Sequence, residues 1–374
     1  MGLQVGPLSP FDEYPIHQTS EPLRFMASSD GRAFDRCYFA ASDLAQELLV
    51  ELGFGVYPNA GTADAFAIFA HGGQHVSVRA HRLIGYDRAD MRFGPISAEV
   101  VVPFQEWRLR LAENSEGLSF DLTYHDTKPQ VFIRRFPVPA SYDGITRPDE
   151  HSGYEGFGRV SGWVELQGRR FELTAEATRA TRDHHWGIRE GMGGRGFILT
   201  EMHRSTHCSQ YVEFGDWGIW AGRVFYDQGT GRPPAVDVVK IERQLRFDPE
   251  TKDLIGGTFI NHLETGEVKR VDYEQVANCV AYLRTGMYIG PDRRGTPTGD
   301  VSHGQFVGDG VVVGETHDVS TTAGRLHLQG MGDRLCRASC DGETTFGVLE
   351  TIDPIAYELC AAATPGFAFA EERV

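Results

Sequence analysis

The sequence predicts an all-β protein built from two antiparallel β-domains, and three observations lead to this prediction. The chain has 374 residues, which exceeds the size at which one hydrophobic core usually keeps growing. It contains 44 glycines beside 23 phenylalanines, 13 tyrosines and 5 tryptophans, a balance typical of tight turns between aromatic-rich strands. Short β-forming segments follow one another without amphipathic helices between them, which argues against parallel βαβ units.

Three hairpins are predicted in the first half of the chain. In each, two segments of β-like or alternating apolar and polar residues flank a short turn sequence rich in Gly, Asn or polar residues. Such turn residues between alternating segments are a strong local signal for a hairpin. The three turns are His71-Gly72-Gly73, residues 113–117 and Gln167-Gly168.

The second half repeats this organisation, and one segment of the first half departs from it. Eight short strand candidates follow residue 195, beginning with FILTEMH at 197–203. Residues 42–52 (SDLAQELLVEL) contain strong helix formers after a capping serine, so local propensity predicts a helix there. Charges and glycines cluster near residues 179–196. We therefore predict two domains, 1–175 and 176–374.

The charge balance excludes several classes of partner. The net charge is −16, which disfavours binding to nucleic acid or to an anionic membrane surface. No apolar run approaches the ~18 residues that span a bilayer, and the first thirty residues lack a basic start followed by an apolar stretch. Six cysteines are too few for a disulfide scaffold. We expect a cytoplasmic protein with free thiols and no membrane insertion.

Two patterns that could indicate a cofactor or a metal are interpreted otherwise. Residues 191–196 match G-x-G-x-x-G, but they precede a predicted strand rather than a helix, so we interpret them as a flexible loop. Two histidine pairs have a spacing that converges on a helix but not in the strands and turns predicted for them. No metal site and no cofactor are therefore predicted. The two pairs are His71 with His75 and His203 with His207.

The densest polar and aromatic cluster is residues 181–190, TRDHHWGIRE. In an extended segment Asp183 and His185 would point to one side, and a carboxylate beside an imidazole is a usable acid–base unit. The same cluster could instead be a buried polar staple between two sheets, with an arginine bridging backbone carbonyls. The two interpretations carry about equal weight. The side chains expected on the opposite side are Arg182, His184 and Trp186.

The string Asp183-His-His-Trp186-Gly187 resembles the Asp-x-x-Trp-Gly signature of two-domain lipocalin-like proteins. This group is related to carotenoid 1,2-hydratase (hydroxyneurosporene synthase), AttH-like proteins and fungal decalin-forming cyclases, and the chain looks like an uncharacterised bacterial branch. Residues 154–162 look like the hairpin that closes the first barrel, and residues 345–350 resemble the closing strand of the second. The resemblance implies two lipocalin-like antiparallel β-barrel or sandwich domains in tandem. It places Asp183 at the opening of the second domain and favours strands over a helix at 42–52.

The resemblance also implies a hydrophobic cavity for a terpenoid, steroid or polyketide-like molecule. Members hydrate, dehydrate, isomerise or cyclise such molecules without an organic cofactor, so we predict a cofactor-independent hydro-lyase or isomerase. Such chemistry requires a proton donor and aromatic rings that stabilise positive charge, and the predicted proton-transfer residues are Asp183 and His185. The group commonly has Gln, Glu or Ser where His185 stands. The predicted substrate-binding residues are Arg182, His184, Trp186, Tyr154, Glu155, Tyr124, His125, Trp163 and Trp220.

A second function class fits the same features. A carrier that binds a hydrophobic ligand without changing it needs the same cavity and no acid–base group. Recovery of an unchanged ligand after long incubation would favour the carrier. The sequence leaves the oligomeric state open, and a homodimer is compatible with it.

Overall fold

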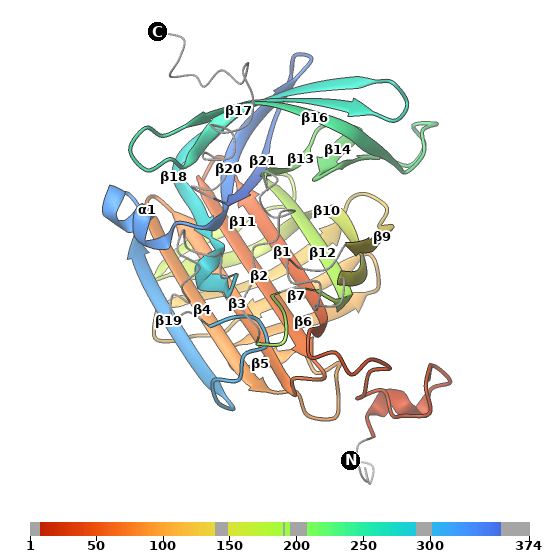
Figure 1. Ribbon diagram of the computed structural model, residues 1–374. Helices are drawn as coiled ribbons and strands as arrows, with labels where there is room; N and C mark the ends of the chain where they lie inside the picture. Colours follow the sequence, from red (N-terminus) through yellow and green to blue (C-terminus); the bar gives the residue numbers. More distant parts are fainter. Residues whose placement is uncertain (1–7, 139–148, 190, 195–207, 289–300, 353–374) are drawn as a thin grey trace.

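The computed structural model describes residues 8–138, 149–189, 191–194, 208–288 and 301–352, and nearly all of its regular structure is β (Figure 1). A 13-stranded antiparallel sheet curls below a closed barrel, and the predicted all-β class with tandem barrel or sandwich units is confirmed. The strands of the curled sheet are β1 (Ala33–Asp43), β2 (Leu48–Tyr57), β3 (Thr62–His71), β4 (Gln74–Leu83), β5 (Arg92–Phe93), β6 (Ile96–Val102), β7 (Glu106–Leu111), β8 (Leu118–Asp126), β9 (Val131–Val138), β10 (Asp149–Leu166), β11 (Arg169–Leu173), β12 (Thr178–Ile188) and β19 (Val311–Asp318).

The barrel closes in the order β13-β14-β15-β16-β17-β18-β20-β21. Three short helical segments accompany the strands: η1 (Pro10–Glu13), η2 (Leu283–Gly286) and α1 (Thr322–Leu328). The helices of the described ranges are too short or too polar to cross a bilayer. The strands of the barrel are β13 (Cys208–Glu213), β14 (Trp217–Trp220), β15 (Arg223–Tyr226), β16 (Ala235–Phe247), β17 (Leu254–Leu263), β18 (Val268–Tyr282), β20 (Met331–Cys340) and β21 (Glu343–Ile352).

Two strands show that sheet membership does not follow the order of the chain. β12 lies between β1 and β10, so the expectation that Asp183 opens the second barrel is wrong. β19 pairs with β4 along its whole length, from Val311↔His81 to Asp318↔Gln74. The curled sheet therefore takes strands from both sides of residue 175. The division into domains at 175/176 stays a prediction.

The helix predicted for residues 42–52 is wrong. β1 ends at Asp43, a four-residue turn follows, and β2 begins at Leu48. All ten residues of β2 are buried between β1 and β3. Burial of apolar side chains on both faces of a strand outweighs helix propensities of less than about 1 kcal/mol per residue, so the tertiary context decides.

The predicted turns are confirmed. Gly72 and Gly73 join β3 to β4 with φ of 57° and 83°, the pair of positive values that a type I′ turn requires. Residues 113–117 lie between β7 and β8, and Gln167-Gly168 lies between β10 and β11. In the predicted loop, Gly191, Gly193 and Gly194 also have positive φ. The strand predicted at 197–203 lies outside the described residues.

The curled sheet packs on both of its faces. On the concave face the ring of Phe39 in β1 contacts Trp107 in β7 at 5.2 Å between centroids, which shows how far the sheet curls. On the convex face Phe66 and Phe157 pack with Trp220 and Phe225 in one cluster that joins the sheet to the barrel. The barrel has a core of its own. The two faces of the first sheet are therefore separate environments.

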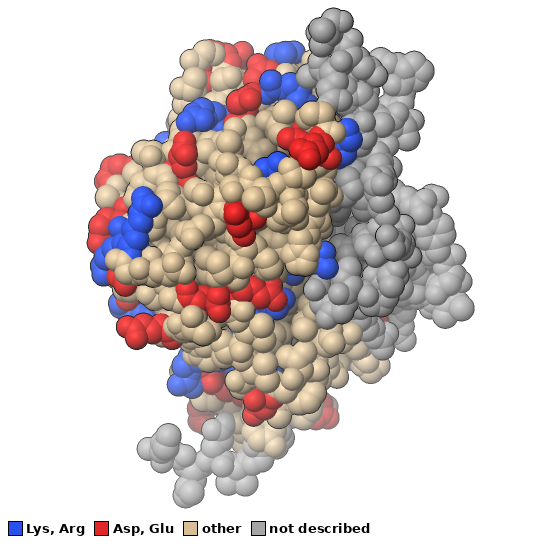
Figure 2. Space-filling model, turned by 90° about the vertical axis from the view of Figure 1, so that its left-hand side faces the viewer, with Lys and Arg blue, Asp and Glu red and all other residues tan. Residues whose placement is uncertain are grey.

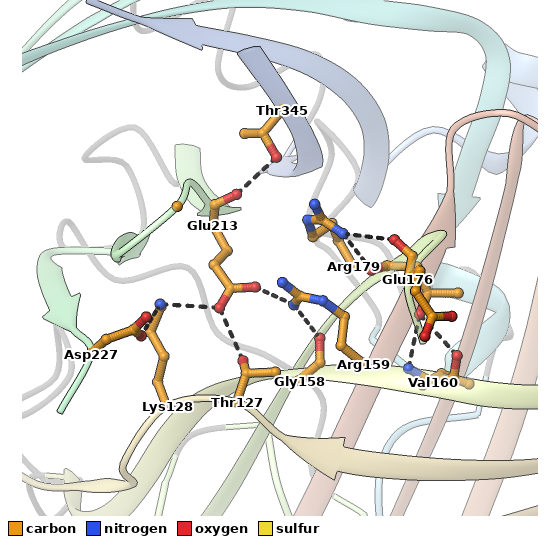
Figure 3. A network of polar contacts seen from close by, with 12 residues as sticks. Thr127, Lys128, Gly158, Arg159, Val160, Glu176, Arg179, Glu213, Asp227 and Thr345 are labelled. Atoms are coloured by element: carbon orange, nitrogen blue, oxygen red, sulfur yellow. Dashed lines mark hydrogen bonds and ion pairs between the residues drawn. The ribbon is translucent and has the colours of Figure 1, made fainter. Parts of the chain in front are cut away.

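A buried ionic network also joins the sheet to the barrel (Figure 3). Lys128 Nζ lies 3.1 Å from Glu213 Oε1 and 2.5 Å from Asp227 Oδ1, and Arg159 pairs with the other oxygen of Glu213. The side chain of Lys128 is 1% exposed and that of Glu213 is 4% exposed. A polar staple between two sheets therefore exists, formed by residues outside the 181–190 cluster. On the face drawn in Figure 2, by contrast, basic and acidic side chains are scattered among each other.

Candidate functional site

The side chains of β12 alternate between the two faces of the curled sheet, as the sequence predicts. His184 lies opposite Cys37 of β1 and Tyr154 of β10. Asp183 lies opposite Tyr38 and Glu155 on the other face. Directly opposed residues of antiparallel strands share a face. One strand thus delivers polar groups to the concave interior and to the seam with the barrel.

A cavity of about 450 Å³ opens on the concave face, within the size range of small-molecule sites. His184 and Tyr154 lie in its wall beside Asp35 and Cys37 of β1. Apolar side chains form most of the remaining surface, and the N-terminal segment covers one side. The apolar lining residues are Phe11, Ile16, Leu23, Phe54, Val56, Ala89, Met91, Val100, Pro103, Phe104 and Trp107.

The polar groups in this wall form one hydrogen-bonded chain. Nε2 of His184 lies 2.6 Å from Oδ1 of Asp35, and Nδ1 of His184 lies 3.1 Å from the hydroxyl of Tyr154. Arg182 donates to the same hydroxyl at 3.3 Å. Arg182 also donates to both oxygens of Asp126, at 2.8 and 2.7 Å. Both ring nitrogens of His184 are therefore engaged, which fixes the ring in the cavity wall.

Electrostatics favour the protonated form of His184. Burial alone would lower the pKa of His184, but Cys37 and Asp35 raise it to about 12. Arg88 lies 3.2 Å from the second oxygen of Asp35, and the pKa of Asp35 is lowered, because His184 and Arg88 together outweigh its desolvation by burial. The ring is therefore protonated at neutral pH, the form from which an imidazole can donate a proton.

The predicted proton-transfer residues lie on the convex face. His185 Nε2 is 3.4 Å from Glu155 Oε1. Burial, and next the nearby charge of Glu155, raise the pKa of Asp183 against the opposing charge of His185. Arg36, on the same face, hydrogen-bonds Tyr288 at 3.3 Å, and its Nε and Nη2 are buried with no hydrogen-bond partner among the described residues. Neither Asp183 nor His185 lines the cavity on the concave face.

Asp64 ties the convex face to a distant part of the chain. It accepts hydrogen bonds from the Tyr57 hydroxyl at 2.9 Å and from the backbone N–H of Gly304 at 2.6 Å. Gly304 in turn accepts from the Thr62 hydroxyl. His303 packs beside them, 2% exposed. The polar groups around Asp64 are therefore covered by a segment from the second half of the chain.

The other predicted binding residues are dispersed. Tyr124 is fully buried below the cavity against Phe39, 5.4 Å between ring centroids. The side chain of His125 is 45% exposed beside Glu106, and Trp163 carries the guanidinium of Arg170 at 4.2 Å. The remaining two contact other rings: the Trp186 ring centroid lies 5.2 Å from that of His184, and the Trp220 ring is tilted against Tyr211 in the seam, 4.5 Å between centroids.

The β1 side of the site was not predicted from the sequence. Asp35 and Cys37 are two residues apart in a strand, so they share a face, but nothing in the sequence pairs β1 with β12. The register of 11 residue pairs between these strands brings them together. Trp107, on β7, reaches the cavity because the sheet curls. Among the described residues, no three His, Cys, Asp or Glu side chains are arranged to hold a metal ion.

Comparison with known families decides where the chain belongs. Residues 8–251 match the model of a protein family described as "Family of unknown function (DUF8625)". The chain belongs to this family. The matched range covers most of the curled sheet, including β1, β10 and β12, so the cavity of this DUF8625 protein lies within it. No curated protein matches the sequence.

Several solved structures resemble this DUF8625 protein at low identity. An AttH-like protein of Nitrosomonas europaea is 12% identical over 90% of this chain and 97% of its own, with a TM-score of 0.47. Kievitone hydratase of Nectria haematococca is 9% identical over 88% and 92%, with a TM-score of 0.44. CghA with Sch210972 is 10% identical over 86% and 88%, with a TM-score of 0.46. AttH-like and hydratase proteins, to which the sequence shows a resemblance, thus appear among the structural matches.

Proposed function

We propose that this protein is a cofactor-independent lyase or isomerase that moves a proton to or from an apolar small molecule bound on the concave face. The observation that carries the proposal is the chain of Asp35, His184 and Tyr154 in the wall of an otherwise apolar cavity. Hydration, dehydration, isomerisation and cyclisation all begin or end with such a proton transfer.

The chemistry follows from the groups in the cavity wall. The imidazolium of His184 protonates an alkene carbon or the hydroxyl of a tertiary alcohol. The rings of Trp107 and Tyr154 border the same cavity, and aromatic faces stabilise the positive charge that develops on carbon. Asp35 holds the ring and stabilises its charged form. Terpenoid, steroid and polyketide-like molecules combine the apolar surface and the alkene or alcohol that this site requires.

The experiments described below also test two alternatives that were predicted from the sequence. A carrier would use the apolar cavity without proton transfer. Proton transfer by Asp183 and His185 would instead occur on the convex face, where Arg36 carries donor atoms that have no partner in the described part of the chain. We place the reaction on the concave face because the described cavity with its hydrogen-bonded imidazole lies there.

The first test is ligand binding at the cavity. The fluorescent apolar probe N-phenylnaphthylamine should bind the wild-type protein. Ala89→Trp, which adds an indole to the cavity lining, should weaken that binding about tenfold or more. Ala112→Trp is the matched control, since Ala112 is also exposed but lies outside the lining. Equal binding by both variants would place the ligand elsewhere.

The second test is proton transfer. The protein is incubated in D₂O with a panel of terpenoid alcohols and alkenes, and the extracts are examined by mass spectrometry. Incorporation of deuterium that is lost in Ala89→Trp and kept in Ala112→Trp supports the proposal. Tight binding without deuterium incorporation or product across the panel would favour the carrier.

A further inference from the structure

The hydroxyl of Tyr154 lies between two side chains that donate hydrogen bonds to it. Nη1 of Arg182 is 3.3 Å from this hydroxyl, and a guanidinium has no acceptor atom. Nδ1 of His184, on the neighbouring strand, is 3.1 Å from it. The pKa of His184 is raised to about 12, and a charged imidazole carries an N–H on both ring nitrogens. Both lone pairs of the Tyr154 oxygen therefore accept hydrogen bonds from the protein.

The proton of the same hydroxyl has no acceptor in the described part of the chain. A tyrosine hydroxyl can donate a hydrogen bond as well as accept, and both of its contacts in the cavity wall are with donors. The two oxygens of Asp35 are bonded to His184 and to Arg88. Tyr154 lines the cavity and is only partly buried. Its O–H is therefore placed to donate to a molecule in the cavity.

His184 differs from Tyr154 because both of its N–H groups point at protein atoms. Asp35 accepts from Nε2 at 2.6 Å, and the Tyr154 hydroxyl accepts from Nδ1. A proton of this ring therefore reaches a bound molecule by way of the Tyr154 oxygen. Arg182, 1% exposed and held by both oxygens of Asp126, fixes that oxygen from the other side.

We propose that Tyr154 donates its hydroxyl proton to an oxygen atom of the bound molecule and that His184 replaces this proton. The inference rests on the proposed function and specifies its substrate class: an apolar molecule with a hydroxyl or carbonyl oxygen, which accepts a hydrogen bond as an alkene carbon does not. Tyr154 is then the catalytic residue that touches the substrate. His184 and Arg182 act through it.

For a tertiary alcohol the steps balance without a further reagent. The Tyr154 proton moves to the hydroxyl oxygen of the substrate, the C–O bond breaks with both electrons on that oxygen, and water leaves. The Nδ1 proton of His184 moves to the Tyr154 oxygen. A C–H group beside the cationic carbon then gives its proton to the Tyr154 oxygen, whose own proton returns to Nδ1, and the C–H electron pair forms the alkene. The net reaction is loss of water.

The first measurement compares two ligands that differ by this oxygen. α-Terpineol is a tertiary alcohol, and limonene is a hydrocarbon formed when it loses water. Both should displace N-phenylnaphthylamine from the wild type. Tyr154→Phe keeps the ring that packs against Phe104, so it should weaken α-terpineol about tenfold and leave limonene unchanged.

Tyr86→Phe is the matched control, because Tyr86 is exposed and lies outside the cavity lining. This variant should bind both ligands as the wild type does. Equal affinity of wild type and Tyr154→Phe for α-terpineol, or an equal loss for both ligands, would overturn the proposal.

The second measurement separates the inference from the proposed function. On a substrate found in the D₂O panel, Tyr154→Phe should lower the rate of deuterium incorporation about 100-fold. The double variant Tyr154→Phe/His184→Ala should be about as slow as either single variant, because the two residues act in series. Losses that multiply in the double variant would overturn the transfer from His184 through Tyr154.

Two further outcomes decide between the two proposals. Wild-type incorporation by Tyr154→Phe, with incorporation lost in His184→Ala, would overturn this inference and leave proton transfer by His184 standing. A loss of α-terpineol affinity in Tyr154→Phe, with no deuterium incorporation across the panel, would overturn the proposed function and leave Tyr154 as the donor to the ligand oxygen.

Discussion

The two faces of the curled sheet hold polar clusters of similar composition, but only the concave cluster borders the cavity described above. On the concave face, His184 lies between Asp35 and Tyr154 and borders a cavity. On the convex face, Asp183 lies opposite Tyr38 and Glu155, and His185 lies beside Glu155, outside that cavity. Adjacent residues of one strand therefore differ in access to a ligand more than in chemistry. An acid–base pair is a candidate site only where a cavity that can hold a ligand lies beside it.

The difference also appears in how completely the polar groups are paired. The concave chain ends in the bidentate contact of Arg182 with Asp126. Between the convex face and the barrel, Glu51 of β2 and Asp333 of the barrel strand β20 are two neighbouring carboxyls that are almost fully buried. On the concave face the hydrogen-bonded partners orient the reactive ring. A buried pair of carboxyls instead makes the stability of the seam between sheet and barrel depend on pH. Each of the following predictions tests one side of this contrast.

The largest effect is expected from replacing the two adjacent histidines of β12. His184→Ala should lower the rate of deuterium incorporation about 100-fold or more, because it removes the proposed general acid. His185→Ala should lower it less than about tenfold, because that ring faces away from the cavity. Steady-state rates on a substrate found in the D₂O panel provide the measurement. The opposite order would move the reaction to the convex face.

A large loss of stability is expected from breaking the ion pair below the cavity. Asp126→Ala leaves the guanidinium of Arg182, 1% exposed, without its carboxylate and should cost about 3–5 kcal/mol. The free energy of unfolding by urea measures this. Asp121→Ala on the neighbouring surface pair with Arg108 is the control and should cost less than about 1 kcal/mol. Similar losses for both variants would mean that Arg182 finds another partner.

The convex acidic pair predicts a dependence of stability on pH. Burial, followed by repulsion from Asp333, raises the pKa of Glu51 well above its ordinary value. A raised folded pKa gives stability that is present in acid and is lost as the pH rises through the folded value. The loss is about 1.4 kcal/mol per pH unit for one such group. Urea midpoints between about pH 5 and pH 9 should fall with pH in the wild type.

Glu51→Gln is the matched variant for this dependence. The amide keeps the shape of the side chain and does not titrate, so the slope should decrease and the variant should exceed the wild type in stability at alkaline pH. Ala45→Glu, which adds a carboxylate at an exposed position of the turn between β1 and β2, should leave the slope unchanged. A wild-type midpoint that rises with pH would show that the pair is ionised in the folded protein.

Features that depend on neighbouring residues in the sequence could be predicted, whereas features that depend on contacts between distant strands could not. Local signals located the turns at Gly72-Gly73 and Gln167-Gly168, because positive φ values are a property of two residues. The alternation of β12 was predictable from the two-residue period of a strand. The partners across the sheet were not, since Asp35 and His184 are 149 positions apart. Propensity at 42–52 failed for the same reason: the burial of β2 is set by β1, β3 and the barrel.

A moderate shift is expected in the titration of His184. Asp35→Asn removes the carboxylate at 2.6 Å and should lower the pKa of His184 by about 1–3 pH units, because the charged ring loses its counterion. NMR titration of the ring protons measures the shift. Asp43→Asn, at the far end of β1, is the control and should leave the titration of His184 as in the wild type. An unchanged pKa in Asp35→Asn would show that Cys37 alone holds the ring charged.

The smallest effect is expected at a tryptophan that lies away from both clusters. Trp163 carries Arg170 over its ring at 4.2 Å, so Trp163→Ala should cost about 0.5–1 kcal/mol of stability and leave the affinity for N-phenylnaphthylamine unchanged. Trp107→Ala, in the cavity wall and 4% exposed, should both destabilise the protein by about 3–5 kcal/mol and alter that affinity. Fluorescence titration of the folded variants separates the two effects. If Trp163→Ala weakened binding and Trp107→Ala did not, the apolar ligand would bind outside the concave face, and the contrast between the faces would lose its functional meaning.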